Sequence, residues 1–491
     1  MTRTVIPLHS LAVRSPVAPS SGAGCAASRC PTAGQAPDSL PASVAERISN
    51  HPCYSEEAHH HFARMHVAVA PGCNIQCNYC NRKYDCANES RPGVTSERLT
   101  PEQAAQKVVA VANRVPQLSV LGIAGPGDAL HDAAKTFETF DRVAERVPDL
   151  TFCLSTNGLA LPDHVEAIRA RAIDHVTITI NMVDPEIGAQ IYPWIFYRNR
   201  RWTGLDAARI LHERQMEGLA GLVAAGVLVK VNSVIIPGVN DQHLREVNRE
   251  IRARGAFLHN LIPLISDPAH GTWFALNGQR GPTPAEVTAL QEQVDGGTRL
   301  MRHCRQCRAD AIGLLNQDRG VEFSRAALPE NDETYDPAPR AAYRAFVDQE
   351  RGERERLAAA AEARLAATAA AQPARQVAVC SKSGGRINQH FGQAREFLIY
   401  SVDAAGVRFL GPRKVDNYCL GGYGDSERLQ GILTLLAGVD TIFAAKIGAC
   451  PRDELAAAGV TVLETYAEET IETALADWFC HQAAAPLRIS A

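Results

Sequence analysis

Three closely spaced cysteines constrain this chain more than any other feature of its sequence. Cys73, Cys77 and Cys80 follow the apolar segment 66–70 with the spacing C-x3-C-x2-C. Thiolate ligands of a [4Fe–4S] cluster normally come in fours, so this loop leaves one iron open to a ligand from outside the protein. A structural zinc site would instead need four ligands that close a tetrahedron. The trio therefore predicts a cluster with one open iron.

The loop resembles the cluster loop of the radical S-adenosylmethionine (SAM) enzymes, including the aromatic Tyr79 before the last cysteine. The resemblance implies that SAM itself binds the open iron through its amino and carboxylate groups. It also implies that Tyr79 belongs to the cofactor site.

Composition limits the partners and the compartment. The chain has 491 residues, a formal net charge of −4 and no basic run that suggests a nucleic-acid or anionic-membrane surface. No apolar stretch approaches the roughly 20 residues that span a bilayer, and the amino terminus lacks a signal-peptide core. Its 14 cysteines favour metal binding in a reducing compartment over disulfides. We therefore expect a cytoplasmic protein with neither nucleic acid nor membrane as a partner.

Changes in composition divide the chain into four segments. Residues 1–45 are rich in Pro, Ser and Ala and predict a disordered tail, in which Cys25 and Cys30 are incidental. Residues 46–335 carry the cysteine trio and form the main domain. Residues 336–372 are rich in Ala, Arg and Glu and predict a helical linker. Residues 373–485 predict a second, small α/β domain.

The main domain alternates short apolar runs with helix-patterned stretches, which predicts an α/β fold with six β-α units and a parallel sheet curling into a partial, TIM-like (βα)6 barrel. The expected strands are 66–70, 118–124, 151–155, 175–180, 227–236 and 257–265. The expected helices are 101–115, 205–225 and 284–301, and Thr-Pro pairs mark the start of the first and last. Because ligands of such folds collect at the carboxyl ends of the strands, the Cys73 loop is well placed for a cofactor.

The second domain shows the same alternation on a smaller scale. Its expected strands are 376–380, 397–402, 441–446 and 460–463, and its expected helices are 427–437 and 468–479.

Glycine and polar residues that close the barrel strands are candidates for SAM contacts. They are Gly125, Gly127 and Asp128 after the second strand, Ser155, Thr156 and Asn157 after the third, and Asn181, Met182 and Asn232 at the fourth and fifth. The turn 125–128 occupies the place of the Gly-Gly-Glu turn that holds the methionine amino group in radical SAM enzymes. The hydroxyl and amide groups of 155–157 suit a ribose, but an Asx turn explains them equally well.

The main domain carries more potential iron ligands than one SAM-bound cluster needs. The additional candidates are His51, Cys53, Cys86, Cys153, Cys304 and Cys307. C-x2-C, the spacing of the last two, suits one face of an iron–sulfur cube, with a zinc site or buried apolar cysteines as alternatives. On the third strand the period of two puts Cys153 on the same side as Ser155. If Ser155 faces the SAM pocket, so does Cys153.

The run from His51 to Gly93, with its five cysteines, resembles the NifB family of nitrogenase iron-molybdenum cofactor biosynthesis proteins, and the resemblance extends from about residue 46 to 310. The segment 387–392 is similar to the small, RNase H-like cofactor-binding domain of the NifX and NafY type. Together these resemblances cover the two domains and leave out the tail and the linker.

The NifB resemblance implies that two further [4Fe–4S] clusters are substrates, fused around a carbide drawn from a SAM methyl group. The implied product is NifB-co, an 8Fe-9S-C cluster that precedes the nitrogenase cofactor, with its extra sulfur from an external donor. One SAM would donate the methyl group, and a second would be cleaved to a 5′-deoxyadenosyl radical. The implied partners are iron–sulfur cluster donors, cofactor carrier or scaffold proteins, and an electron donor.

The assignment of ligands to clusters stays open. Six ligands shared by two substrate clusters give three ligands per cluster, fewer than the four of a permanent site. Clusters held in this way could be rearranged and released. His51, Cys53, Cys86 and Cys153 are candidates around one cluster and Cys304 with Cys307 at the other, and His59, His60 or His61 could replace His51.

Further charged and sulfur groups have weaker assignments. Glu89 is a candidate catalytic residue that, with Arg91, could move protons, but a surface ion pair is an equal alternative. In the second domain His390, Cys419 and Cys450 could dock a finished cluster, or the cysteines could be part of the core.

Two other functions remain open from the sequence. One is a radical SAM methyltransferase or maturase with fully ligated auxiliary clusters for electron transfer. The other is a non-catalytic cluster scaffold or carrier, which would have no use for SAM cleavage.

Overall fold

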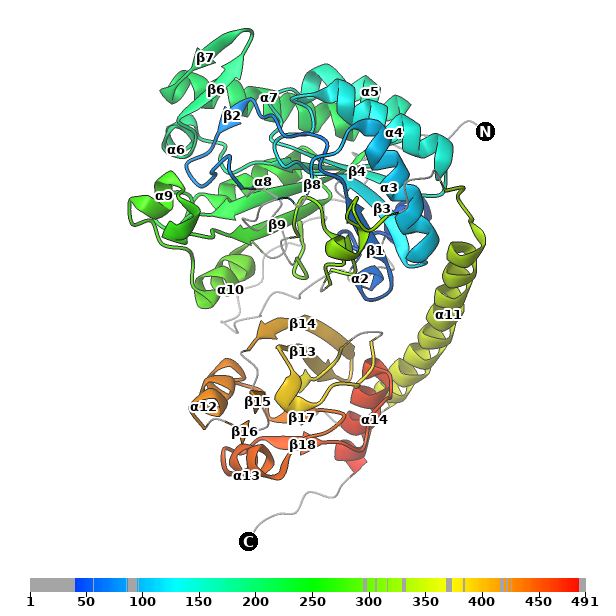
Figure 1. Cartoon of the computed structure of the whole chain (residues 1–491). Coiled ribbons are helices and arrows are strands. Elements are labelled where there is room, and N and C mark those ends of the chain that lie inside the picture. The colour runs from blue at the N-terminus through cyan, green and yellow to red at the C-terminus, as the bar shows by residue number, and fades with distance from the viewer. Residues whose placement is uncertain are drawn as a thin grey trace, which may run out of the picture. The chain divides into compact units, whose positions relative to one another are not determined.

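The computed structural model describes residues 40–484 except 56, 85, 87–94, 96, 295–297, 305–306, 316, 329–332, 368–372, 383–384, 416–418, 421–422 and 425. The chain forms two compact units, Met1–Ala341 and Ala342–Ala491, which are described separately (Figure 1).

The first unit is built on a parallel sheet, which confirms the predicted fold class. Its six central strands are β1 (Ala63–His66), β3 (Leu118–Ile123), β4 (Thr151–Thr156), β5 (His175–Thr179), β8 (Leu228–Ile235) and β9 (Leu258–Pro263). Neighbours in this order pair in parallel. At the edges, β10 (Arg299–Leu300) pairs with β9 and β11 (Ile312–Gly313) runs antiparallel to β1. The sheet does not close, so the barrel is partial.

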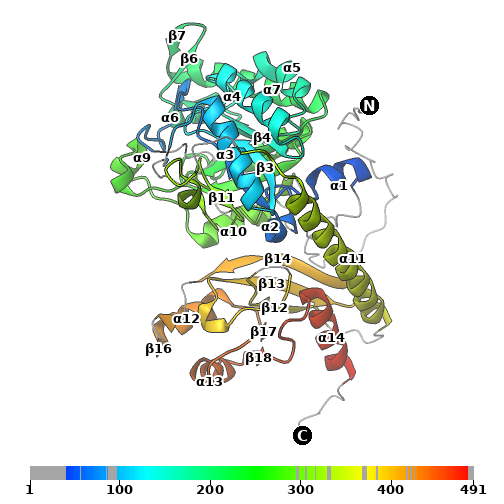
Figure 2. The ribbon, with the colours of Figure 1, turned by 45° about the vertical axis from the view of Figure 1, so that its right-hand side comes forward.

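Helices cover the outer face of this sheet. They are α3 (Pro101–Arg114), α4 (Ala133–Arg146), α5 (Val165–Ala170), α7 (Gly204–Ala224), α8 (Leu244–Ala253) and α10 (Pro284–Gln293). Figure 2 shows α3 and α4 beside β3 and β4, where Val108 and Phe140 are fully buried in the core. Thr100 and Thr283 form capping boxes with a proline at the first helical position, as their Thr-Pro pairs predict.

Two predicted elements have different bounds. The first strand is Ala63–His66 rather than 66–70, because only Ala63 to His66 pair with β3. Residues 67–70 are buried by neighbouring loops: the Val67 amide bonds to Gly122, and Ala68 accepts from Leu99. The predicted helix 284–301 ends at Gln293, and Arg299–Leu300 become the edge strand β10.

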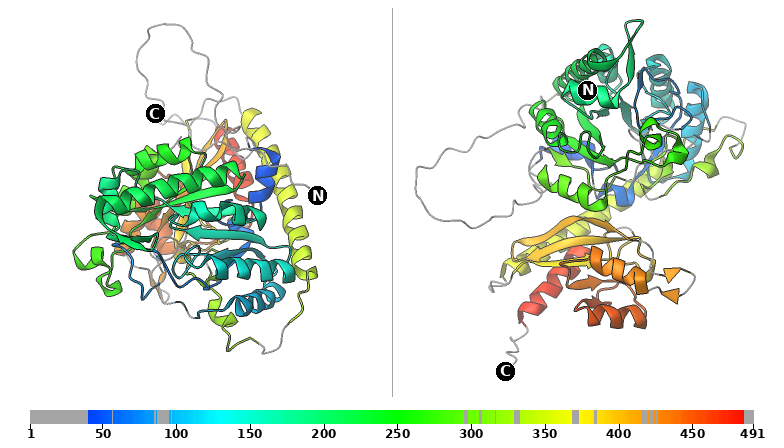
Figure 3. Two further views of the ribbon diagram at one scale, coloured as in Figure 1. Left: turned by 90° about the horizontal axis from the view of Figure 1, so that it is seen from above. Right: turned by 90° about the vertical axis from the view of Figure 1, so that its left-hand side faces the viewer.

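Several elements were not predicted. Helix α1 (Ala42–Ile48) begins before residue 46, with Val44 in the core, and α2 (Ala58–His61) precedes β1. A small sheet joins β2 (Ile75–Gln76) of the cysteine loop to the hairpin β6 (Trp194–Tyr197) and β7 (Arg200–Trp202). The right panel of Figure 3 shows this hairpin standing out from the barrel.

The second unit has a five-stranded mixed sheet in the order β14 (Gly406–Lys414), β13 (Glu396–Asp403), β12 (Arg375–Val379), β17 (Thr441–Phe443) and β18 (Thr461–Leu463). Alternate residues of β12 point to two cores: Ala378 packs near Leu429 of α12 (Ser426–Leu435) and Leu455 of α13 (Ala449–Ala457). Val377 and Val379 instead face the core that contains α14 (Ile471–Ala484). The sheet is thus covered on both faces.

Helix α11 (Ala338–Ala367) fills most of the segment expected to be a helical linker. Its carboxyl-terminal half packs on the second unit, where Ala361 and Leu365 join the core of α14. Arg354 pairs with Glu472 at 2.8 Å and Arg364 pairs with Asp477 at 2.9 Å.

Candidate active site

The cysteine loop is held in shape by its own polar groups. The side-chain amide of Gln76 donates to the carbonyls of Cys77 (2.9 Å) and Cys80 (2.8 Å), and the Cys80 amide donates to Cys77. Cys77 is buried, whereas Cys73 and Cys80 are half-buried. The loop therefore presents its three cysteines on a fixed backbone.

Two thiols of this loop, those of Cys73 and Cys77, have raised pKa values. Burial raises the pKa of Cys77 well above its usual value, and Cys80 and Cys73 raise it further. Burial and then the carboxylate of Asp128 raise the pKa of Cys73. Iron must therefore displace protons from these sulfurs as it binds.

The turn 125–128 docks against the start of the cysteine loop. The Gly127 amide donates to Ala70 at 2.8 Å, and the Asp128 amide donates to Gly72 at 2.7 Å. A Cβ atom on Gly127 would lie only 1.9 Å from the Gly72 carbonyl oxygen, so no other residue fits there. Gly125 has φ of +145°, which also favours glycine. Gly127 thus permits close approach of two loops of the chain itself.

Asp128 connects this turn to the end of β4. Its buried carboxylate accepts from the amides of Asn157 (2.5 Å) and Leu130 (2.9 Å) and from the hydroxyl of Thr156 (3.1 Å). The side-chain amide of Asn157 reaches Cys73 Sγ at 3.6 Å. Two of the predicted SAM segments, 125–128 and 155–157, therefore meet at the cysteine loop.

The other predicted SAM contacts form a buried network. Asn181 donates to the hydroxyls of Tyr79 (2.6 Å) and Tyr192 (2.9 Å), and its oxygen accepts from the Val234 amide (2.7 Å). Met182 is fully buried in the same cluster. Asn232 accepts from Asn260 at 3.0 Å. Asn181 thus connects the cysteine loop to β8 inside the barrel.

Two of the additional cysteine segments meet inside the first unit. His303, next to Cys304, contacts the Pro52 carbonyl at 3.0 Å, which ties the His51-Pro52-Cys53 segment to the C-x2-C motif. On the sheet, Cys153 is the direct neighbour of Gly122 and His175. Cys53, Cys86, Cys304 and Cys307 are half-buried. None of the described cysteines forms a disulfide.

Two β1 side chains hold the C-x2-C segment. Arg64 donates from Nε to Cys307 Sγ at 3.2 Å and also bonds to the carbonyls of Gly313, Leu314 and Gln317. The Nδ1 atom of His66 contacts the Arg308 carbonyl at 3.1 Å. Sequence reasoning missed both residues, because their partners lie more than 240 positions away.

Buried imidazoles lie beside the predicted ligand His51. The His51 and His175 rings are 4.4 Å apart, and Tyr54 packs against both. Burial lowers the pKa of His51 well below its usual value, and burial followed by Arg47 lowers that of His175 to about 3. Nε2 of His51 and both ring nitrogens of His175 are buried without a hydrogen-bond partner. Neutral, unsatisfied imidazoles of this kind fit an interior that takes up metal.

Glu89 and Arg91 lie outside the described residues. Among the described residues, no three His, Cys, Asp or Glu side chains gather closely enough to hold a single metal ion. His59, His60 and His61 form a short helix, and the His59 ring stacks on His303 at 5.0 Å.

In the second unit the candidate residues occupy different environments. His390 accepts from the Gly392 amide at 3.0 Å and caps a short 3-10 helix. Cys450 is exposed on α13, so it is not part of the core. Cys419 lies on β15 (Cys419–Leu420), and its side chain is outside the described set.

Family comparisons agree with this arrangement. Residues 67–251 match the Radical SAM superfamily, and residues 374–480 match the family described as dinitrogenase iron-molybdenum cofactor. The first unit is therefore the barrel of a radical SAM enzyme that takes part in cofactor biosynthesis.

Similar proteins define the family more closely. The chain is 62% identical to the FeMo cofactor biosynthesis protein NifB of Rhodobacter capsulatus over 430 residues, which cover 87% of this chain and 95% of that protein. It is 58% identical to NifB of Herbaspirillum seropedicae (90% and 85% covered) and 51% identical to NifB of Azotobacter vinelandii (93% and 92% covered). The chain belongs to the NifB family.

Among solved structures, methylornithine synthase is similar at a TM-score of 0.32 and 15% identity, over 51% of this chain and 66% of that one, which is too weak to carry an argument. In the described part of the chain, no helix is long and apolar enough to cross a membrane.

Proposed function

We propose that the first unit binds a [4Fe–4S] cluster and SAM at Cys73, Cys77 and Cys80, and takes two further [4Fe–4S] clusters as substrates. The product would be NifB-co, made by fusing these clusters with a SAM-derived carbide and an extra sulfur. One observation carries the proposal: segments of the chain that hold five of the six further potential ligands, all but Cys86, come together around β1 and β4 of the same barrel. A single SAM-bound cluster needs none of them.

The chain's own residues would position the reactants. When bound, SAM supplies a methyl group and, on reductive cleavage, a 5′-deoxyadenosyl radical. The turn 125–128 and Asn157 bond to the cysteine loop, and the segment 155–157 would line the SAM pocket. The interior excludes water, because Asn181, Asn232 and Tyr79 are all almost fully buried.

The substrate clusters would lie among His51, Cys53, Cys86, Cys153, Cys304 and Cys307. An iron–sulfur cluster with thiolate ligands is anionic, and Arg64 places a buried guanidinium against Cys307. A cation in this low-dielectric interior stabilises such an anion. Arg64 would therefore stabilise the negative charge of a cluster bound at the C-x2-C end of the site.

The proposal extends to the whole chain. Residues 46–335 would be the catalytic domain, 336–372 a linker and 373–485 a cofactor-binding domain that exchanges the product with carrier or scaffold proteins. The reaction would be of the lyase type, and its oxygen-sensitive clusters suit the cytoplasm.

Paired variants test the assignment of ligands. Anaerobic reconstitution of Cys304→Ala/Cys307→Ala should lose about four irons and the NifB-co product, yet still produce 5′-deoxyadenosine from SAM. Cys450→Ala is the matched control, because Cys450 is exposed on α13. Full iron content and normal product in the double variant would contradict the proposal.

The same assay separates the alternatives. Auxiliary clusters that survive many turnovers unchanged would indicate a radical SAM methyltransferase or maturase. A chain that binds clusters but never cleaves SAM would be a carrier.

A further inference from the structure

The hairpin β6–β7 is bonded directly to the cysteine loop. Ile195 and Trp194 pair with Ile75 and Gln76, and the Phe196 amide donates to the Asn74 carbonyl at 2.7 Å. Asn74 is the residue that follows Cys73. A short path of one hydrogen bond and a few covalent bonds therefore connects the hairpin to a predicted ligand of the SAM-binding cluster.

The hairpin and the loop together carry a concentrated positive charge. Segments 73–84 and 192–202 contain five cations and no carboxylate, in a chain whose net charge is −4. We call these cations the basic face: Arg82, Lys83, Arg198, Arg200 and Arg201. All are exposed, and no ion pair described in the structure includes any of them. The excess of positive charge is divided between two segments, so neither segment contains a long run of basic residues.

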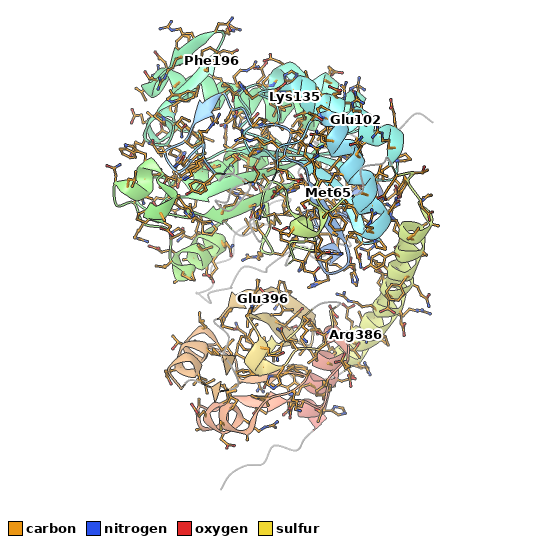
Figure 4. The ribbon with its side chains drawn as sticks, viewed as in Figure 1. Met65, Glu102, Lys135, Phe196, Arg386 and Glu396 are labelled. Carbon is orange, nitrogen blue, oxygen red and sulfur yellow. The ribbon has the colours of Figure 1, made fainter. Side chains whose placement is uncertain are left out.

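Aromatic groups accompany these cations. The Arg200 guanidinium lies 4.1 Å from the Trp202 ring, and that of Arg201 lies 5.0 Å from the Trp194 ring. Phe196, labelled in Figure 4, is 48% exposed on the projecting hairpin. Arginine, tryptophan and exposed aromatic groups are the residues that dominate protein interfaces. The hairpin thus has the composition of a contact surface.

An open cleft continues this surface to the cysteines themselves. It has a volume of about 950 Å³, and its lining includes Cys77, Cys80 and Arg82 together with Trp273 of α9 (Trp273–Leu276). Trp273 and Leu276 are 57% and 66% exposed. Large apolar side chains are rarely left together at a surface without a partner.

We propose that the basic face and the adjoining cleft dock an acidic, one-electron carrier protein. The inference rests on the proposed function, because reductive cleavage of SAM consumes one electron delivered through the SAM-binding cluster. The carrier is oxidised by one electron, and the cluster is reduced by one. Electron-transfer encounters use small interfaces, and charge complementarity mainly raises their association rate. A surface directly over the cluster loop shortens the path of the electron.

The test compares a protein reductant with a small one. The full chain is reconstituted anaerobically, and initial rates of 5′-deoxyadenosine formation are measured with a photoreduced acidic ferredoxin or with dithionite. In Arg198→Gln/Arg200→Gln/Arg201→Gln, the ferredoxin-driven rate should fall about tenfold or more, since steering by charge is lost. The dithionite-driven rate should stay within about twofold, since a small ion needs no docking surface. Raising the salt concentration should slow only the ferredoxin-driven reaction of the unchanged chain.

The matched control removes the same charge from another exposed place. Arg245→Gln/Arg249→Gln/Arg252→Gln on α8 should leave both rates unchanged. The docking proposal would be overturned if the control variant lost as much of its ferredoxin-driven rate as the basic-face variant. It would also be overturned if the basic-face variant lost as much of its dithionite-driven rate, or kept its full ferredoxin-driven rate. The proposal would also be overturned if the basic face were needed to bind single-stranded RNA or anionic vesicles but not for the ferredoxin-driven rate. An unchanged chain that fails to cleave SAM even with dithionite would instead refute the proposed function.

Discussion

The guanidinium of Arg64 donates a hydrogen bond to the sulfur of Cys307 at 3.2 Å, across 243 positions of sequence. Arg64 is 2% exposed, and its other described bonds are to backbone carbonyls. A buried cation needs a nearby anion, since removing a charge from water is costly. In the proposed function, a cluster bound at Cys307 would supply that anion.

Arg64→Met should therefore shift the redox potential of the cluster at Cys307 in the negative direction. A hydrogen bond to a charged group contributes about 1.5 kcal/mol, which corresponds to roughly 60 mV for one electron. Arg64→Lys keeps the charge and should shift the potential less. Redox titration followed by electron paramagnetic resonance measures both.

Arg340→Met controls for the loss of a buried arginine elsewhere. Arg340 is fully buried and pairs with Asp149 at 2.7 Å. This variant should lower the melting temperature and leave the cluster potential unchanged. Equal potentials in Arg64→Met and the unchanged protein would show that Arg64 only supports the fold.

Asp128→Asn should weaken SAM binding by about tenfold or more and also destabilise the metal-free protein. The new amide group would face the Asn157 N–H, leaving a donor unsatisfied at a cost of about 1–3 kcal/mol. Thr156→Ala removes the hydroxyl that donates to Asp128 and accepts from the Gly158 amide, and it should cost about 1–3 kcal/mol. Equilibrium dialysis with SAM and urea unfolding give the two quantities. If Asp128→Asn binds SAM as tightly as the unchanged protein, the turn 125–128 is not part of the SAM pocket.

Asn181→Ala should lower stability without SAM, because the Val234 amide loses its acceptor and the hydroxyls of Tyr79 and Tyr192 each lose one donor. Each unsatisfied buried group costs about 1–3 kcal/mol. Tyr192→Phe removes one of these groups together with its bond and should cost less. Thermal unfolding of the metal-free protein is the measurement. An unchanged melting temperature with weaker SAM binding would make Asn181 a direct SAM contact instead.

Acid should destabilise the metal-free protein through its buried histidines. Burial lowers the pKa of His259 to about 3, and its ring bonds to Asn248 and Ser233. In the unfolded chain a histidine has a pKa near 6.5, so between about pH 6.5 and 3 the unfolded state binds a proton that the folded state does not. Stability should fall by roughly 1.4 kcal/mol per pH unit for each such histidine as pH drops through this window.

His259→Gln should make the loss of stability less steep between pH 7 and pH 5, as measured by urea unfolding. His481→Gln, at an exposed position near the end of α14, should leave the slope as it was. The same slope in all three proteins would contradict this assignment.

The sequence predicted the barrel well, because its strands are continuous buried apolar runs. The observed β3, β4, β5, β8 and β9 agree with the predicted strands within two residues. The first strand was displaced because the apolar residues 67–70 are buried by loops, and apolar character alone does not distinguish these environments. The hairpin β6–β7 was missed because the apolar run of β6 is only four residues long and β7 consists of two arginines and a tryptophan.

The sequence indicated which chemical groups the candidate site contains better than it indicated the contacts between them. Cysteine spacing and the turns after the strands are local patterns, so the sequence could select the trio and the segments 125–128 and 155–157, which the structure brings together. Arg64 and His175 depend on partners from distant segments, which local patterns do not reveal. Gly127 was expected to admit a ligand, but its missing side chain makes room for the Gly72 carbonyl.

We propose that one chain fuses two clusters around a carbon from SAM, and a single anaerobic experiment tests this function. The full chain is reconstituted with iron and sulfide, its iron is counted, and SAM and dithionite are then added. About twelve irons, for three clusters of four, with formation of both 5′-deoxyadenosine and S-adenosylhomocysteine, is the predicted result. About four irons with 5′-deoxyadenosine alone would contradict it and leave an ordinary radical SAM enzyme.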